Sequence, residues 1–146
     1  MPGLHLQIAS TEEAWRVVRA IRKEVFIEEQ RCPPQEEWDR WDALSTHYVV
    51  RIENTPRGTA RTYRTVRHGA IVLVLGRIAV LKPYRGQGLA TQMVDTIVGR
   101  HSHETIHIDA QAHLHDWYAQ WGFVRSGPNF IEVGIDHVPM LRQKRA

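Results

Sequence analysis

The chain has 146 residues, a hydrophobic content of 42%, a charged content of 24% and a formal net charge of +3. This length and balance fit one globular domain over residues 1–146 and exclude a disordered or fibrous chain. No apolar run approaches the ~20 residues of a membrane span, and no secretory signal is visible, so a cytoplasmic location is expected. Cys32 is the single cysteine, which excludes an internal disulfide.

Hydrophobic periodicity predicts the first elements. Residues 4–8 alternate apolar and polar side chains, as a half-buried strand does. Ser10 and Glu13 predict a capping box at the start of a helix over residues 15–26. A polar loop rich in acidic residues and tryptophan follows over residues 32–46.

The middle of the chain predicts three strands, over residues 48–52, 59–66 and 71–81. Turn residues separate them at Pro56–Gly58 and at His68–Gly69. Short connections of this kind join antiparallel neighbours.

The last third predicts helices alternating with strands. A helix begins at Leu89, a strand covers residues 105–110, and a short helix ends at Gly122 as its C-cap. Strand pieces follow at residues 123–124 and 130–140. The predicted strands in the first part of the chain are antiparallel, and helices connect the strands in the last third. This order indicates an α/β chain (an α+β mixed sheet) with helices on both faces.

The turn between the third strand and the long helix has the features of a phosphate site. Arg85-Gly86-Gln87-Gly88 precedes Leu89-Ala90 at the expected helix start. A helix N-terminus has spare N–H donors and a positive dipole end, and glycines let an anion approach the backbone.

Two common phosphate loops do not fit this turn. A P-loop needs a Lys-Ser/Thr pair after its second glycine, where this chain has Leu89 and Ala90. A dinucleotide fingerprint needs a third glycine or alanine where Thr91 stands, and it enters its turn directly from the strand. Here residues 82–85 intervene.

The pattern Arg85-x-x-Gly88-x-Ala90, after Ile78-Ala79-Val80 and Pro83, resembles the pyrophosphate loop of the GCN5-related N-acetyltransferases (GNAT). The resemblance implies the GNAT acyl-CoA N-acyltransferase fold, with a mostly antiparallel twisted sheet splayed between its fourth and fifth strands. It also implies acetyl-CoA as co-substrate, bound by Ile78, Ala79, Val80, Arg85, Gly86, Gln87, Gly88, Leu89, Ala90 and Thr91.

A second segment resembles the same family. Tyr118-Ala119-Gln120-Trp121-Gly122-Phe123 matches the family's Tyr-x-x-x-Gly-Phe signature. Taken alone, Tyr118 reads as a core aromatic with a bonded hydroxyl. The resemblance implies instead that Tyr118 protonates the departing CoA thiolate.

The N-terminal region resembles the ElaA-like branch, which carries Arg-x-x-Val-Phe-x-x-Glu-Gln-x-Cys-Pro. Residues 22–33 match this run, and Gly134-Ile135-x-His137 fits the C-terminal part. Val133 departs from the pattern, because an acidic residue is expected there.

The implied reaction is attack of a primary amine on the thioester carbonyl within a ternary complex, so Cys32 is not required. The amine needs a proton acceptor. N–H groups of Ile78–Val80 are expected to polarise the carbonyl. The candidate bases are Glu29, His137, His47 and His107, with Glu29 and His137 ahead.

Other functions stay open. One is a CoA-binding regulatory module without turnover. Another is an acyl-homoserine-lactone-synthase-like acyltransferase, because Arg22, Phe26 and Glu37-x-Asp39-x-x-Asp42 resemble that family's N-terminal motif.

The expected partner is a small-molecule or protein amine, and a homodimer is an option. No nucleic-acid motif is present, and no membrane partner is expected. Five histidines are candidate metal ligands: His101, His103, His107, His113 and His115. Their spacing does not match that of a zinc-binding motif, so no metal site is expected.

Overall fold

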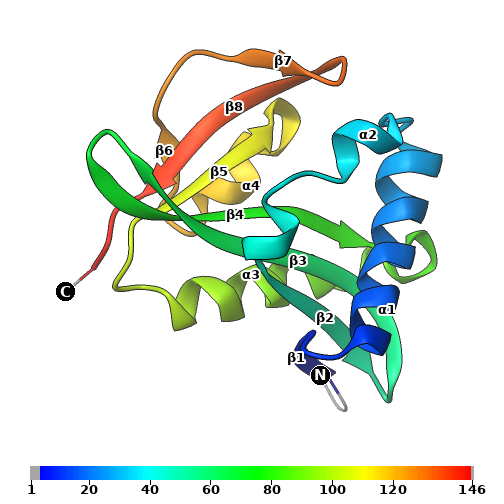
Figure 1. Ribbon diagram of the computed structural model, residues 1–146. Coiled ribbons are helices and arrows are strands. Elements are labelled where there is room, and N and C mark those ends of the chain that lie inside the picture. Colours follow the sequence, from blue (N-terminus) through cyan, green and yellow to red (C-terminus); the bar gives the residue numbers. More distant parts are fainter. Residues whose placement is uncertain (1–3, 146) are drawn as a thin grey trace. The chain divides into compact units, whose positions relative to one another are not determined.

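The computed structural model describes residues 4–145 (Figure 1), which form two compact units. The first contains residues 4–63 and 77–94, and the second contains residues 64–76 and 95–145. Each unit has buried apolar residues of its own, such as Val50 in the first and Ile108 in the second.

The first unit begins with an antiparallel pair. Strand β1 (Leu4–Ile8) pairs with β2 (Thr46–Ile52), and β2 pairs with the first part of β3 (Thr55–Arg67). Between β1 and β2 the chain forms helix α1 (Glu12–Arg22), which lies along β2 (Figure 1). The remaining elements between them are the π-helix η1 (Lys23–Glu29), helix α2 (Pro34–Glu37) and the 3-10 helix η2 (Asp42–Leu44).

The end of β4 (Ala70–Val80), the 3-10 helix η3 (Lys82–Tyr84) and the start of α3 (Leu89–Arg100) complete the first unit. The predicted apolar stripe of α3 is confirmed, since all five of its members are buried: Leu89, Met93, Val94, Ile97 and Val98.

The second unit centres on β5 (Ile106–Gln111) and its antiparallel partner β8 (Ile135–Arg142). The first part of β4 pairs in parallel with β5 at Leu73–Ile106 and Val74–His107. The 3-10 helix η4 (Ala112–Leu114), helix α4 (His115–Ala119), β6 (Val124–Arg125) and β7 (Phe130–Glu132) complete it, and both β6 and β7 pair with β8.

The eight strands hydrogen-bond in the order β1-β2-β3-β4-β5-β8-β6, with β7 on β8. The predicted mixed sheet is therefore confirmed: it is mostly antiparallel and has one parallel pair, β4–β5. No helix among residues 4–145 combines the length and hydropathy needed to cross a bilayer.

Two local predictions are wrong. The N-cap of α1 is Thr11, whose hydroxyl accepts from the N–H of Ala14 at 3.1 Å, so Ser10 and Glu13 do not form a capping box. The hairpin between β2 and β3 turns at Glu53 and Asn54, both with positive φ, which suits a type I′ turn.

Pro56–Gly58, the predicted turn, lies instead inside β3. A Cβ atom at Gly58 would come within 2.7 Å of the Ala79 carbonyl oxygen. Gly58 is therefore a glycine of close approach between neighbouring backbones.

An ion pair in the second unit makes an acid-sensitive contact. Arg64 donates two hydrogen bonds of 2.8 Å to Glu104, and His101 lies 3.0 Å from the same carboxylate. These contacts, led by the Arg64 hydrogen bonds, lower the pKa of Glu104 from its ordinary 4.5 to about 2.

Because the folded-state pKa of Glu104 is depressed, its contribution to stability is complete above about pH 4.5 and is lost as the pH falls toward 2. We expect Glu104→Gln to lower the free energy of unfolding at pH 6 and to flatten its decline between pH 4.5 and 2. Urea unfolding across this range measures both effects. A variant with the same slope as wild type would contradict the assignment.

Candidate functional site

The last residues of β4 are held by an apolar cluster. Ala79 is buried with Ile21 of α1 and Val25 of η1, and the partly buried Leu81 packs against them. The N–H of Leu81 also donates to the carbonyl of Arg57 at 2.8 Å. The strand segment predicted to contact an acyl group is therefore fixed in the first unit.

Arg77 gives β4 an irregular backbone immediately before this segment. Its φ is +50°, a left-handed conformation that is uncommon for a residue with a Cβ atom. Its guanidinium lies 2.6 Å from Glu37 and 3.3 Å from Asp39. Such strain persists only where surrounding contacts impose it, and it is concentrated at functional sites.

The predicted phosphate loop is an open turn at the start of α3. Gly86 and Gly88 both have φ of +78°, and a Cβ atom at either would meet nothing within 4 Å. Gly86, Gln87 and Gly88 are exposed, whereas Leu89 is buried in the core. The first helical hydrogen bond runs from Gln92 to Gly88, so the first-turn amides have no helical acceptor and can receive an anion.

Arg85 and Glu29 connect this loop to η1. Two guanidinium nitrogens of Arg85 donate to the Glu29 carboxylate at 2.6 and 2.8 Å, and its Nε donates to the Val80 carbonyl at 2.8 Å. The Arg85 hydrogen bonds lower the pKa of Glu29, which makes Glu29 a weaker proton acceptor. This geometry favours a positioning role for Glu29.

Tyr118 lies in the second unit, on α4. Its ring is buried and contacts Trp117 and Phe123, with ring centroids 4.8 and 6.0 Å away. Burial raises the pKa of the Tyr118 phenol, so the hydroxyl keeps its proton at neutral pH. Gly122 has a φ of +89°, but the predicted C-cap is wrong, because α4 ends at Ala119 and its C-cap is Gln120.

Two candidate histidines lie on the paired strands β5 and β8. His137 stands opposite Gln111, so His107, Asp109 and His137 share one face of this pair. His107 Nε2 lies 3.0 Å from Asp109. His137 Nδ1 lies 2.8 Å from the Ile135 carbonyl oxygen.

The bond to Ile135 determines the tautomer of His137. A carbonyl only accepts, so Nδ1 donates, and the Nε2 of a neutral His137 ring carries the lone pair. Phe130 stacks on the ring with centroids 5.6 Å apart. His137 is therefore an oriented imidazole with a lone pair on Nε2, which suits a general base.

His47 and the acidic residues of the long loop lie in the first unit. Arg22 donates to Asp42 at 2.6 Å and to Glu37 at 3.4 Å, and both Arg22 and Glu37 are buried. Arg61 donates to Asp39 and Asp42 at 2.7 and 2.8 Å. The acidic residues of the long loop are thus largely paired with arginines of the same unit.

The sequence matches the family described as Acetyltransferase (GNAT) domain over residues 9–144. The protein Rv2851c of Mycobacterium tuberculosis, named as a UPF0039 protein, is 39% identical over 126 residues, covering 84% of this chain and 80% of that protein. This chain belongs to the GNAT acetyltransferase family.

Two solved structures agree with this GNAT membership. An acyl-CoA N-acyltransferase from Pseudomonas aeruginosa is 28% identical and matches with a TM-score of 0.84 over 95% of this chain and 97% of that one. Escherichia coli ElaA is 24% identical and matches with a TM-score of 0.80 over 98% of this chain and 100% of its own. The likeness to ElaA establishes a shared fold.

Sequence reasoning missed Arg61 and Arg77 in this GNAT protein. Both are arginines on strands, where a charged side chain usually faces solvent, yet Arg61 is buried and Arg77 is half-buried. Their partners lie 19 to 41 positions away in the chain. The one signal in the sequence was the presence of several acidic residues in the loop.

The guanidinium group of Arg61, which donates to both Asp39 and Asp42, leads to a prediction about stability. Lysine cannot reproduce its paired bonds to Asp39 and Asp42, so we expect Arg61→Lys to lower the free energy of unfolding by about 1.5–3 kcal/mol. Urea unfolding measures this. Arg16→Lys is the control, because Arg16 makes only an exposed pair with Glu12 and should change stability by less than about 0.5 kcal/mol. Equal effects would mean that the Arg61 geometry is unimportant.

Proposed function

We propose that this GNAT protein transfers the acetyl group of acetyl-CoA to a primary amine of a small molecule or a protein. The observation that carries the proposal is the exposed turn at Gly86–Gly88 before α3, in a chain of this family. The family match over residues 9–144 supports treating both units as one catalytic domain. The likeness to ElaA supports placement in the ElaA-like branch.

The turn and the end of β4 would hold the coenzyme. Amides at Gly86–Thr91 would bind its diphosphate, since they lie at a helix N-terminus whose preceding turn, Gly86–Gly88, is exposed. Backbone N–H groups of Ile78–Val80 would polarise the acyl carbonyl. Arg85, tied by Glu29 and Val80, would keep the turn in shape. The splay between β4 and β5 remains a prediction of this proposal.

Acetyl-CoA supplies an acyl group activated as a thioester. The amine nitrogen forms a bond to the acyl carbon, and the carbon–sulfur bond breaks. In this scheme Nε2 of His137 accepts the proton of the amine, directly or through water, and the Tyr118 hydroxyl donates a proton to the leaving thiolate. No covalent enzyme intermediate is needed, so Cys32 has no catalytic role.

A screen of amine acceptors with detection of thiol release tests this function. The purified protein is supplied with acetyl-CoA and a panel of aliphatic amines, amino acids and peptide N-termini. Amine-dependent thiol release with an N-acetylated product by mass spectrometry is the expected result. Coenzyme binding without turnover across the panel would support the regulatory-module alternative instead.

A further inference from the structure

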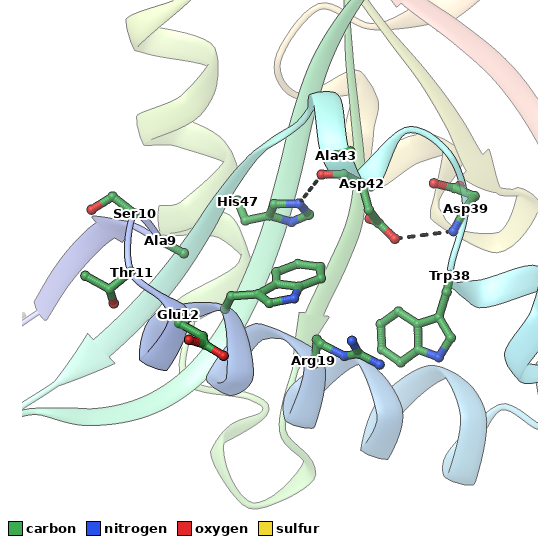
Figure 2. A pocket seen from close by; sticks show the side chains of 11 residues that line it. Ala9, Ser10, Thr11, Glu12, Arg19, Trp38, Asp39, Asp42, Ala43 and His47 are labelled. Atoms are coloured by element: carbon green, nitrogen blue, oxygen red, sulfur yellow. Dashed lines mark hydrogen bonds between the residues drawn. The ribbon is translucent and has the colours of Figure 1, made fainter.

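A cavity of about 720 Å³ lies in the first unit, and its lining contains none of the residues that the proposed function assigns to acetyl transfer. Its wall comes from the segment before α1, from α1 itself, from the loop before β2 and from His47 at the start of β2 (Figure 2). The side chains that matter for its chemistry are Glu12, Trp15, Arg19, Trp38, Asp42 and His47.

Two indole rings in this wall already hold a cation. The guanidinium carbon of Arg19 lies 4.9 Å from the centroid of Trp38 and 5.9 Å from that of Trp15. Cations within about 6 Å of an indole face are attracted by its quadrupole. Arg19 therefore occupies, from within the chain, an arrangement that suits an ammonium or guanidinium group.

His47 adds an unused hydrogen-bond acceptor. The residue is only 7% exposed, and its Nε2 lies 2.9 Å from the Asp42 carbonyl oxygen, as Figure 2 shows. Since the carbonyl only accepts, Nε2 donates and Nδ1 carries the lone pair. Nδ1 is buried without a hydrogen-bond partner, and burial lowers the pKa of His47, which keeps the ring neutral.

The carboxylate of Asp42 in the wall is ionised. Burial by itself raises the pKa of Asp42, but hydrogen bonds from Arg22 and Arg61 outweigh it and lower the pKa. Glu12 is exposed at the rim. The cavity thus combines indole faces and one unsatisfied acceptor, while Asp42 is paired with Arg22 and Arg61, and Glu12 with Arg16.

We propose that this cavity binds a small organic cation with N–H donors, an ammonium or guanidinium compound, which replaces Arg19 on the indole faces and donates to Nδ1 of His47. A buried acceptor without a partner is destabilising, and a ligand N–H that donates to it removes that cost. The site goes beyond the proposed acetyl transfer, because it shares no residue with the turn at Gly86–Gly88, Tyr118 or His137.

Three probes of one shape test the chemistry without coenzyme present: benzylamine, benzyl alcohol and benzoate. Calorimetric titration of the full chain is expected to show saturable benzylamine binding, at least 10-fold weaker binding of benzyl alcohol, and no benzoate binding. In ¹⁵N-histidine NMR spectra, benzylamine should shift the His47 ring signals. Equal binding of the three probes, or an unmoved His47 signal, would overturn the proposal.

Substitutions inside and outside the cavity test whether benzylamine binds there. Trp38→Leu should weaken benzylamine binding by about 3- to 30-fold, in line with a cation–π contact, whereas Trp117→Leu in the second unit should not. Arg19→Gln should tighten it, because the internal competitor is removed; weaker binding would contradict the proposal. Circular dichroism confirms that each variant is folded.

The failure of this proposal is distinguishable from failure of the proposed function. Gly88→Val, which targets the coenzyme turn, should leave benzylamine binding unchanged. If benzylamine binding is lost in Gly88→Val but kept in Trp38→Leu, the amine is held as an acetyl acceptor, and the cavity assignment is wrong.

Discussion

Replacing Tyr118 by phenylalanine is expected to lower kcat by about 10²- to 10⁴-fold while leaving coenzyme affinity unchanged. The substitution removes the hydroxyl that we propose as proton donor to the leaving thiolate and keeps the ring that packs on Trp117 and Phe123. Steady-state thiol release gives kcat, and calorimetry gives the affinity for CoA. A lower kcat together with an unchanged affinity for CoA would identify Tyr118 as a general acid rather than a coenzyme-binding residue.

Tyr48→Phe is the matched control, because Tyr48 is also buried but lies on β2 in the other unit. It should retain turnover. If Tyr118→Phe keeps kcat within about 3-fold of wild type, proton donation by this phenol is ruled out. Loss of CoA affinity with unchanged kcat would instead assign Tyr118 to coenzyme binding.

The second large effect is expected at Gly88, where valine should abolish CoA binding. The φ of +78° is costly for a β-branched residue, so the turn must change shape or carry strain of about 1–2 kcal/mol. Either outcome displaces the amides that would meet the diphosphate. Calorimetric titration with CoA measures the loss, and thermal unfolding measures the stability.

Gly69→Val provides a control with the same backbone conformation. Gly69 also has φ of +78°, and a Cβ atom there would meet nothing within 4 Å, but it lies in the turn between β3 and β4. Both variants should lose similar stability, and only Gly88→Val should lose CoA affinity. Unchanged affinity in Gly88→Val would contradict the assignment of the turn.

Local sequence patterns predicted the elements whose geometry depends on near neighbours. The apolar spacing from Leu89 to Val98 produces a helix because those side chains bury one stripe. The turn at His68–Gly69 follows from residues that tolerate positive φ. The same local logic predicted the glycine turn before α3.

The wrong predictions came from sequence patterns that fit two different local structures. Pro56–Gly58 contains typical turn residues, but Gly58 is needed where β3 meets the Ala79 carbonyl. Glu53 and Asn54 then form the turn with positive φ. Thr11 rather than Ser10 caps α1, a shift of one residue that spacing alone does not resolve.

By itself, the sequence determined the order of strands and helices and the glycine turn, because each depends on patterns within a few residues. The mixed sheet followed from that order of elements. Only the tertiary structure decided which charges meet: Glu29 with Arg85, and Arg61 and Arg77 with the acids of the loop. It also left Nδ1 of His47 without a partner. Such contacts join residues distant in the chain, and their energies depend on burial and distance, which no local pattern encodes.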